Sequence, residues 1–290
     1  MAIVSIKNLT KKFGPATAVD RLSLDIDAGE IFGLVGPDGA GKTTAIRLML
    51  GIMSPDSGER NVSTRTGYVS QRFSLYTELT VQENLELFAD LYNVSDTERG
   101  PRLKRLMQFS RLEAFRDRLA RNLSGGMKQK LALSCALIHT PNVLFLDEPT
   151  TGVDPLSRRD LWRLLFDLWQ ESVTIIVSTP YMDEAERCSR VGFMSHGKLI
   201  ALGPPDRLRE KFDGAIFEVF TDDKFRARET IASLPFIKDV NIFGDGLHIT
   251  VDAGAGDAAE AALRQALPVR SMRRIDPSME DVFFQLTAER

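Results

Sequence analysis

One stretch, residues 30–51 (EIFGLVGPDGAGKTTAIRLMLG), constrains this chain more than any other, because an apolar run, a glycine-rich turn and a helical pattern follow one another without a break. Inside it, residues 36–43 spell GPDGAGKT, an unbroken match to G-x-x-x-x-G-K-[ST] in the strand–loop–helix context that the motif requires. The alternative is a glycine-rich turn with an incidental lysine, which the flanking strand and helix disfavour. The sequence therefore predicts a loop that binds phosphate groups.

Each residue type in this loop has a physical reason. The glycines let the backbone approach a ligand closely, so that successive N–H groups converge on phosphate oxygens, and the following helix adds the positive end of its dipole. Lys42 is expected to reach the β- and γ-phosphates, and the Thr43 hydroxyl to ligate Mg²⁺. Asp38 suits this loop only if its carboxylate faces away from the phosphates. The predicted nucleotide-binding loop comprises Gly36, Pro37, Asp38, Gly39, Ala40, Gly41, Lys42, Thr43 and Thr44.

Composition narrows the class of protein. With 290 residues, 43% hydrophobic and 27% charged, the chain has room for one large domain or two. It contains no apolar run long enough to span a membrane and no signal-peptide pattern, so we expect a cytoplasmic protein. Its net charge of −3 gives no general attraction to nucleic acid. Cys135 and Cys188 lie in apolar helical patterns typical of reduced core residues.

The segments flanking the loop predict a sheet with a helical insertion. Residues 2–9 and 22–27 alternate as half-buried strands do, residues 54–60 read as a turn, and a short strand ends at Gln71. Phe13, upstream of the loop, is either a core aromatic, which its position alone favours, or a ring that stacks on adenine. Two helical patterns, residues 81–94 and 101–112, form a helical insertion of about residues 72–136.

Two further segments of the helical insertion have alternative interpretations. Residues 72–80 carry apolar side chains in a loop-like context, so they either pack internally or receive an apolar helix from a partner. Ser124 precedes two glycines, Gly125 and Gly126, at the start of a helical pattern. The residues alone favour a plain helix cap over a second anion site.

Acidic residues end a buried strand at residues 143–149 (VLFLDEP). A continuous apolar run suits a parallel strand covered on both faces, and its carboxyl end lies where α/β folds bind ligands. Asp147 then suits Mg²⁺ ligation, and Glu148 suits orienting and deprotonating a water. A second buried strand, residues 173–180, points at the same edge, and Pro180 is expected to start the next helix with Thr179 as its cap.

The last part of the chain has a different pattern. Residues 213–290 read as strand, helix, strand, strand, helix, strand and a closing helix, which is the ferredoxin-like order. No catalytic pairing or metal-ligand spacing occurs there. We expect a small accessory or regulatory α+β domain.

Taken together, the phosphate loop, Gln71, LSGGMKQK, VLFLDEP, the GVDP turn and STPYMDEAE resemble an ABC transporter ATP-binding cassette over residues 2 to about 212. The resemblance implies an α/β P-loop NTPase fold over residues 1–212, with a mixed sheet core, a small antiparallel β subdomain and a helical subdomain, followed by the ferredoxin-like domain over residues 213–290. It also implies ATP and Mg²⁺ as cofactors. By resemblance the catalytic residues are Glu148, Lys42 and Gln71, the metal ligands are Thr43, Gln71 and Asp147, and further nucleotide contacts come from Phe13, Ser124, Gly125, Gly126 and Asp154.

The resemblance implies partners as well. The LSGG segment would bind the γ-phosphate held by a second cassette, and the pair would power a transmembrane permease from the inner face of the cell membrane. The terminal PSMEDVFFQLT is similar to the tail of ATPase subunits that serve small bacterial export permeases for drugs and polysaccharides, and the loop with LSGGMKQK is most like the first half of tandem-cassette members. Alternatives are a nucleotide-gated subunit with slow hydrolysis and a non-transport ATPase.

Two departures from the family pattern carry expectations. Pro180 stands where the family places a histidine that contacts the γ-phosphate and the catalytic glutamate, so we expect ATP to bind but to be hydrolysed slowly. The segment NVSTRT, residues 61–66, is shorter than usual, so the edge of the small antiparallel sheet is expected to be trimmed.

Overall fold

In the computed structural model, residues 2–62, 65–232 and 234–288 are described, and the chain divides into two compact units. The first covers residues 1–205 and the second residues 206–290. The predicted boundary after residue 212 lies downstream of this division, because the short helix α7 (Pro205–Arg209) begins at the junction. None of the helices in the described part of the chain is long and apolar enough to cross a membrane.

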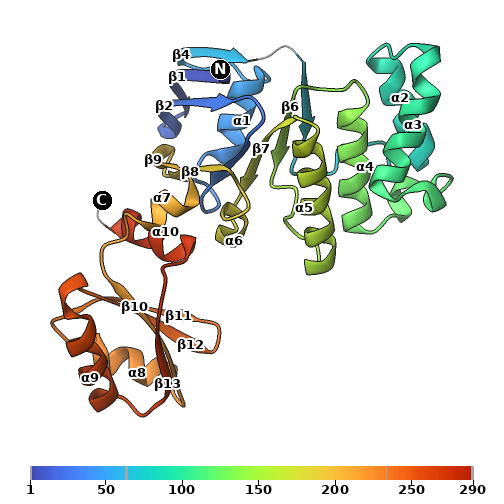
Figure 1. Ribbon diagram of the computed structural model, residues 1–290. Helices are drawn as coiled ribbons and strands as arrows, with labels where there is room; N and C mark the ends of the chain where they lie inside the picture. The colour runs from blue at the N-terminus through green and yellow to red at the C-terminus, as the bar shows by residue number, and fades with distance from the viewer. Residues whose placement is uncertain (1, 63–64, 233, 289–290) are drawn as a thin grey trace. The chain divides into compact units, whose positions relative to one another are not determined.

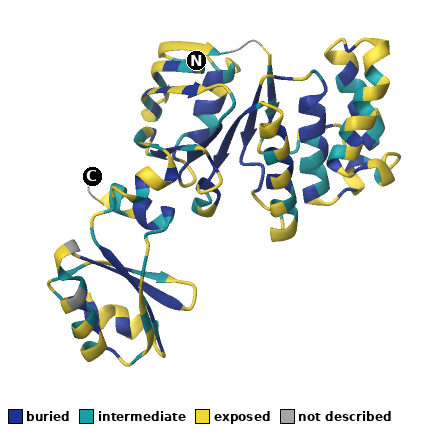
Figure 2. Ribbon diagram, in the orientation of Figure 1, coloured by how far each residue is buried: buried dark blue, intermediate teal, exposed yellow. Residues whose placement is uncertain are grey.

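A six-stranded sheet forms the centre of the first unit, with the strand order β5-β6-β7-β3-β8-β9. All neighbouring strands are parallel except β8 and β9, so the sheet is mixed as expected. The central strands consist of apolar runs that are buried on both faces, which is why they pair in parallel under covering helices (Figure 2). The strands are β3 (Ile31–Val35), β5 (Thr66–Val69), β6 (Val143–Asp147), β7 (Thr174–Thr179), β8 (Arg190–Ser195) and β9 (Lys198–Gly203).

A second, antiparallel sheet in this unit consists of β1 (Ala2–Phe13), β2 (Ala16–Asp27) and β4 (Ser57–Val62). Helix α1 (Lys42–Leu50) packs in one core with this sheet and with side chains of β3, β6 and β7. The strands predicted at residues 2–9 and 22–27 were shorter than β1 and β2. The turn predicted at residues 54–60 was wrong in its second half, because β4 is an edge strand with mostly exposed side chains and shows no apolar alternation. Ser63 and Thr64, in the segment expected to be trimmed, lie outside the described residues.

The helical insertion forms an arm at the opposite end of the unit from the antiparallel sheet (Figure 1). It comprises α2 (Val81–Leu91), α3 (Asp96–Ser110), two 3₁₀ turns (Glu113–Phe115 and Ala120–Asn122) and α4 (Gly125–Leu137). Helix α3 starts five residues before its predicted proline start at Pro101, because the acids Asp96 and Glu98 occupy its first turn and Pro101 lies inside the helix.

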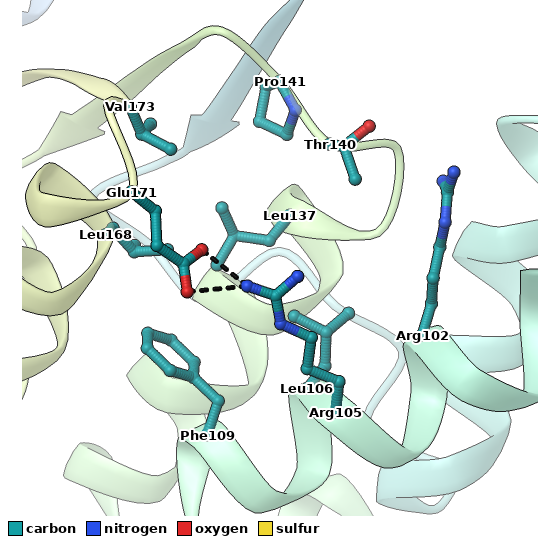
Figure 3. A pocket seen from close by; sticks show the side chains of 10 residues that line it. All are labelled: Arg102, Arg105, Leu106, Phe109, Leu137, Thr140, Pro141, Leu168, Glu171 and Val173. Carbon is teal, nitrogen blue, oxygen red and sulfur yellow. Dashed lines mark hydrogen bonds and ion pairs between the residues drawn. The ribbon is translucent and has the colours of Figure 1, made fainter. Parts of the chain in front are cut away.

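The remaining helices of this unit are α5 (Pro155–Gln170), which packs against β7, and the single turn α6 (Met182–Ala185). An apolar hollow of about 280 Å³ separates the end of α5 from α3, and Arg105 crosses it to contact both carboxylate oxygens of Glu171 at 2.6 Å (Figure 3). Both partners are more than half exposed, so this ion pair stabilises the seam by at most about 1 kcal/mol. None of the residues lining this hollow belongs to the predicted nucleotide site.

The second unit has the predicted ferredoxin-like topology. Its four strands form an antiparallel sheet in the order β11-β12-β10-β13, and α8 and α9 pack on one face around Phe217, Ile249 and Leu263. The elements are β10 (Ala215–Thr221), α8 (Lys224–Ile231), β11 (Ile237–Phe243), β12 (Gly246–Val251), a 3₁₀ turn (Ala253–Ala255), α9 (Gly256–Ala266), β13 (Val269–Ile275) and α10 (Met279–Ala288).

A buried carboxylate joins α10 to the sheet of this unit. Asp281 accepts hydrogen bonds from the N–H of Ser278 at 2.8 Å and its hydroxyl at 2.6 Å, and Nδ1 of His248 lies 3.3 Å from its other oxygen. Burial raises the pKa of the Asp281 carboxyl, but the hydrogen bonds with His248 and Ser278 together lower it by more than burial raises it. The pKa of this carboxyl is therefore below its ordinary value. The charged form is therefore the stabilising one.

The Asp281→Asn chain should lose about 1 to 3 kcal/mol of stability in the second unit at pH 7, because a buried charged acceptor is removed. A carboxyl whose folded pKa is depressed contributes stability above its unfolded pKa and loses that contribution as pH falls through the folded pKa. Urea unfolding should thus separate the two chains at pH 7, and the difference should begin to shrink below about pH 4 and vanish once the pH is below the depressed folded pKa of Asp281. Asp245→Asn, in an exposed turn, is the matched control. A difference that persists unchanged in acid would contradict this assignment.

Candidate functional site

The phosphate loop connects the carboxyl end of β3 to the start of α1. Gly41, with φ of 100°, is the N-cap of α1, and a Cβ at this position would lie 2.2 Å from the carbonyl oxygen of Ala18. Only glycine fits there without displacing the neighbouring backbone. The first N–H groups of α1 have no carbonyl partner within the helix, so they supply the donors that an anion needs. Asp38 is exposed in this loop.

Lys42 is the buried cation of the loop, with 3% of its surface exposed. Its amine donates to the carbonyl oxygens of Gly36 at 2.8 Å and Pro37 at 3.0 Å. The same amine lies 3.1 Å from Oε1 of Glu148, which is also buried. Two residues more than a hundred positions apart in the chain therefore meet directly behind the phosphate loop.

Oxygen atoms suited to a divalent cation converge on Asp147, at the end of β6. The hydroxyl of Thr43 donates to Oδ1 at 3.0 Å and that of Ser178 to the same atom at 2.8 Å. Burial, followed by the charge of Asp147, raises the pKa of Tyr68, whose hydroxyl lies 3.5 Å from Oδ2 and stays protonated. Within the described residues no group of three or more His, Cys, Asp or Glu side chains is placed so that it could hold a metal ion by itself. Hydroxyl and carboxylate oxygens beside a phosphate loop nevertheless fit Mg²⁺, which keeps several ligands from water and phosphate.

Glu148 follows Asp147 in an uncommon backbone conformation for a residue other than glycine, with φ of 49°. Its N–H lies 3.2 Å from the carbonyl oxygen of Ser178 and 3.0 Å from the hydroxyl of the same residue, which hold the bend. Its carboxylate also accepts from Gln71 Nε2 at 2.8 Å and from the Thr151 hydroxyl at 3.3 Å. The strand end, the loop after β5 and the phosphate loop thus meet at one carboxylate.

Ser124 caps α4, as its position before two glycines predicted. Its hydroxyl accepts the N–H of Met127 at 3.3 Å, and it is exposed together with Gly125. A Cβ on Gly126 would lie 2.5 Å from the Ser157 hydroxyl, so this glycine is also required by the contact between α4 and α5. No hydrogen bond or ion pair in the described part of the chain joins Ser124 to the phosphate loop.

Models of known protein families match segments in both units of this chain. The ABC transporter family model matches residues 19–151, and the model for the C-terminal domain of DrrA1-3-like ATP-binding proteins matches residues 203–287. The Nod factor export ATP-binding protein I of Paraburkholderia xenovorans (strain LB400) is 37% identical over 301 residues, covering 99% of this chain and 97% of the relative. This chain belongs to the ABC transporter family.

A second relative, the probable multidrug ABC transporter ATP-binding protein YbhF of Escherichia coli (strain K12), is 39% identical over 303 residues, and the chain spans only 52% of its length. Among solved structures, an ATP-binding subunit of an ABC transporter is 30% identical, with a TM-score of 0.66 over 72% of this chain and 93% of that one. A dimeric post-hydrolysis state of the cassette MJ0796 bound to ADP and Pi is 27% identical, with a TM-score of 0.64 over 69% of this chain and 98% of that one.

Phe13 and Asp154, which resemblance to the family assigned to nucleotide contacts, lie at the end of β1 and at the start of α5. Phe13 ends β1 and is 50% exposed, so the core interpretation favoured by its position was wrong, and the amine of Lys11 lies 5.9 Å from the centre of its ring. Asp154 caps α5 by accepting the N–H of Ser157 at 2.9 Å. Hydrogen bonds from Ser157 lower the pKa of the Asp154 carboxyl, which keeps it charged at neutral pH.

The segment after β7 departs from prediction. Pro180 was expected at the first helical position with Thr179 as cap, but α6 starts at Met182 with Tyr181 as its N-cap. The Thr179 hydroxyl instead accepts the N–H of Tyr181 at 3.1 Å and donates to Glu184 at 2.6 Å. This local turn gives the backbone N–H of Tyr181 a hydrogen-bond acceptor before the helix begins at Met182. Sequence reasoning also missed Ser178, which reaches Asp147 from the adjacent strand, and Thr151, whose hydroxyl donates to Glu148 within the same turn.

Proposed function

We propose that this subunit binds and hydrolyses ATP and that two cassettes, closing on two ATP molecules, power an export permease. The observation that carries the proposal is the meeting of Lys42, Glu148 and Gln71 beside the Thr43 and Asp147 oxygens at one edge of the sheet. Such a site combines a phosphate cradle, oxygen ligands and a candidate base. The name of one relative, a Nod factor export ATP-binding protein, supports export, and the name of the other, a probable multidrug ABC transporter ATP-binding protein, supports a role in transport.

The residues take separate roles in this proposal. Lys42 binds the β- and γ-phosphates, and Thr43, Asp147 and Gln71 hold Mg²⁺, which when bound neutralises charge on the transferred phosphoryl group. Glu148 takes a proton from the attacking water, because its carboxylate lies within hydrogen-bond reach of the groups that surround the phosphate loop. Phe13 stacks on the adenine ring.

Closure of two cassettes would complete each site. Ser124, Gly125 and Gly126 of one cassette would donate to the γ-phosphate bound by the other, and Asp154 would lie at the same interface. Support comes from the exposure of Ser124 and Gly125 at a helix start, and from the 60% exposed side chain of Leu156, next to the Asp154 turn. The dimeric MJ0796 cassette is a solved example of such an assembly in a related protein. The second cassette would be either another copy of this chain or a different cassette.

The closing motion of the two cassettes would pass to a permease helix that contacts residues 72–80, the segment leading into the helical arm. Within it, Leu75 and Phe73 pack in the arm's own core, whereas Tyr76 is 54% exposed. Internal packing therefore applies to Phe73 and Leu75, whereas Tyr76 would be available to contact a partner helix at the inner face of the membrane.

A slow site is the second form of this proposal. Pro180 follows Thr179 at the end of β7 and has neither an N–H donor nor a charge, so it cannot replace the family histidine. The chain would then hold ATP tightly but turn it over slowly, or act as a nucleotide-gated subunit whose partner cassette hydrolyses.

The proposal is tested by ATP binding to the purified chain. Lys42→Ala should weaken ATP binding by about 10- to 100-fold, because a charge-assisted contact to phosphate is lost. Isothermal titration calorimetry measures the change, and Lys104→Ala, an exposed lysine of α3, is the matched control. Equal affinities in the two variants and the unaltered chain would refute the proposed site.

A further inference from the structure

Glu184 is a buried carboxylate to which the proposed function gives no role. It lies in α6, and 1% of its surface is exposed. One of its oxygens accepts the hydroxyls of Thr179 at 2.6 Å and Thr150 at 3.1 Å. The other accepts Nη2 of Arg158 at 3.0 Å and Nε at 3.3 Å. All its strong acceptor positions are therefore used, as a buried carboxylate requires.

The three partner residues, which make four hydrogen bonds to Glu184, belong to segments that surround the proposed chemistry. Thr150 lies in the turn that starts with Glu148, and Thr179 ends β7 immediately before Pro180. Arg158 is in the first turn of α5, just after the Asp154 cap, and its guanidinium stacks 4.2 Å above the Tyr181 ring. One carboxylate thus links the turn that carries the candidate base, the segment at position 180 and the loop assigned to the cassette interface.

We propose that Glu184 is a positioning residue for ATP hydrolysis, which holds the turn from Glu148 to Asp154 in register with both the end of β7 and the start of α5. This inference rests on the proposed function, because it assumes that Glu148 acts on the attacking water. Glu148 has a left-handed backbone that needs external support, and the turn after it contains few bonds of its own. Within that turn the N–H of Thr151 donates to the carbonyl of Glu148 and that of Val153 to the carbonyl of Thr150, both at 3.2 Å.

The chemistry of the link explains why a carboxylate is needed. A glutamine at position 184 would keep an oxygen for the two threonine hydroxyls but would present an NH₂ group to the Arg158 guanidinium, so donor would face donor. The turn would stay connected to β7 and lose its connection to α5. Pro180 offers no hydrogen-bond donor of its own to compensate.

Hydrogen exchange of the full chain tests this without relying on turnover. In Glu184→Gln, the amides of Thr151 and Val153 should exchange about tenfold faster or more, since a charge-assisted buried contact supporting them is lost. Exchange in α1 and the affinity for ATP should stay within about twofold, and single-turnover hydrolysis should fall about tenfold or more because the base is misplaced. Asp183→Asn, on the neighbouring exposed carboxylate that lies 3.5 Å from Arg158, is the matched control and should match the unaltered chain.

A second variant guards against a folding defect. Thr150→Val keeps the shape of the side chain and removes only one hydroxyl, and it should move exchange and single-turnover rate in the same direction by a smaller factor. Unaltered exchange and unaltered turnover in both variants would overturn the proposal, as would a parallel loss of ATP affinity and turnover, which indicates general destabilisation. Failure of the proposed function is recognised separately, because the unaltered chain would then bind no ATP at all.

Discussion

A Glu148→Gln chain is expected to lose ATP turnover by about 10²- to 10⁴-fold while it still binds ATP, because the general base is removed and the phosphate loop is left in place. The amide keeps the size of the side chain, and its oxygen can still accept from Lys42, which lies 3.1 Å from the carboxylate. Its NH₂ group would replace the oxygen that accepts from Gln71 at 2.8 Å, and the Gln71 amide can turn to present its own oxygen there. Binding energy therefore changes much less than the rate.

The measurement is release of phosphate from ATP under conditions in which the unaltered chain gives a reliable rate. Glu113→Gln, an exposed glutamate at the start of a 3₁₀ turn in the helical arm, is the matched control. If Glu148→Gln turned over ATP as fast as this control, another residue would have to act as the base.

Pro180→His should raise turnover by about 10²- to 10³-fold, the usual contribution of one transition-state donor. The imidazole would stand directly after Thr179 at the end of β7, and Ser178 pairs in register with Asp147 on the adjacent strand. A donor restored there lies at the same sheet edge as the candidate base.

Pro180→Ala separates the donor from the backbone effect, since it removes the ring without adding an imidazole. We expect Pro180→His to turn over ATP much faster than Pro180→Ala, and Pro180→Ala to turn it over at about the rate of the unaltered chain. A histidine variant no faster than the alanine variant would show that the missing donor does not limit hydrolysis, and the slow-site form of the proposed function would be abandoned.

The parts of the site that are local in sequence could be predicted from it. The strand, glycine turn and helix around Lys42 are contiguous, and the apolar run before Asp147 ends at its acids, so residue types alone placed both segments at the same edge of a parallel sheet. The ferredoxin-like order of the second unit was also legible, because its strands and helices alternate with clear turns between them.

What the sequence could not supply depends on contacts between distant segments. Ser178 looks like an ordinary strand residue, and only the register of β6 against β7 brings it to Asp147. The exposure of Phe13 is decided by how β1 and β2 pair at their ends, which alternation does not report. Glu184 reads as one acid of an amphipathic helix, and its burial follows from tertiary packing alone.

The most direct test of the whole account is sedimentation of the Glu148→Gln chain with Mg²⁺ and ATP, alone and combined with Ser124→Arg. If ATP joins two cassettes, held by the Lys42 loop of one and the helix start at Ser124 of the other, Glu148→Gln should sediment as a species of twice the chain mass. The added arginine should return it to a monomer that still binds ATP. A monomer in the first case, or a dimer that survives the arginine, would contradict the account.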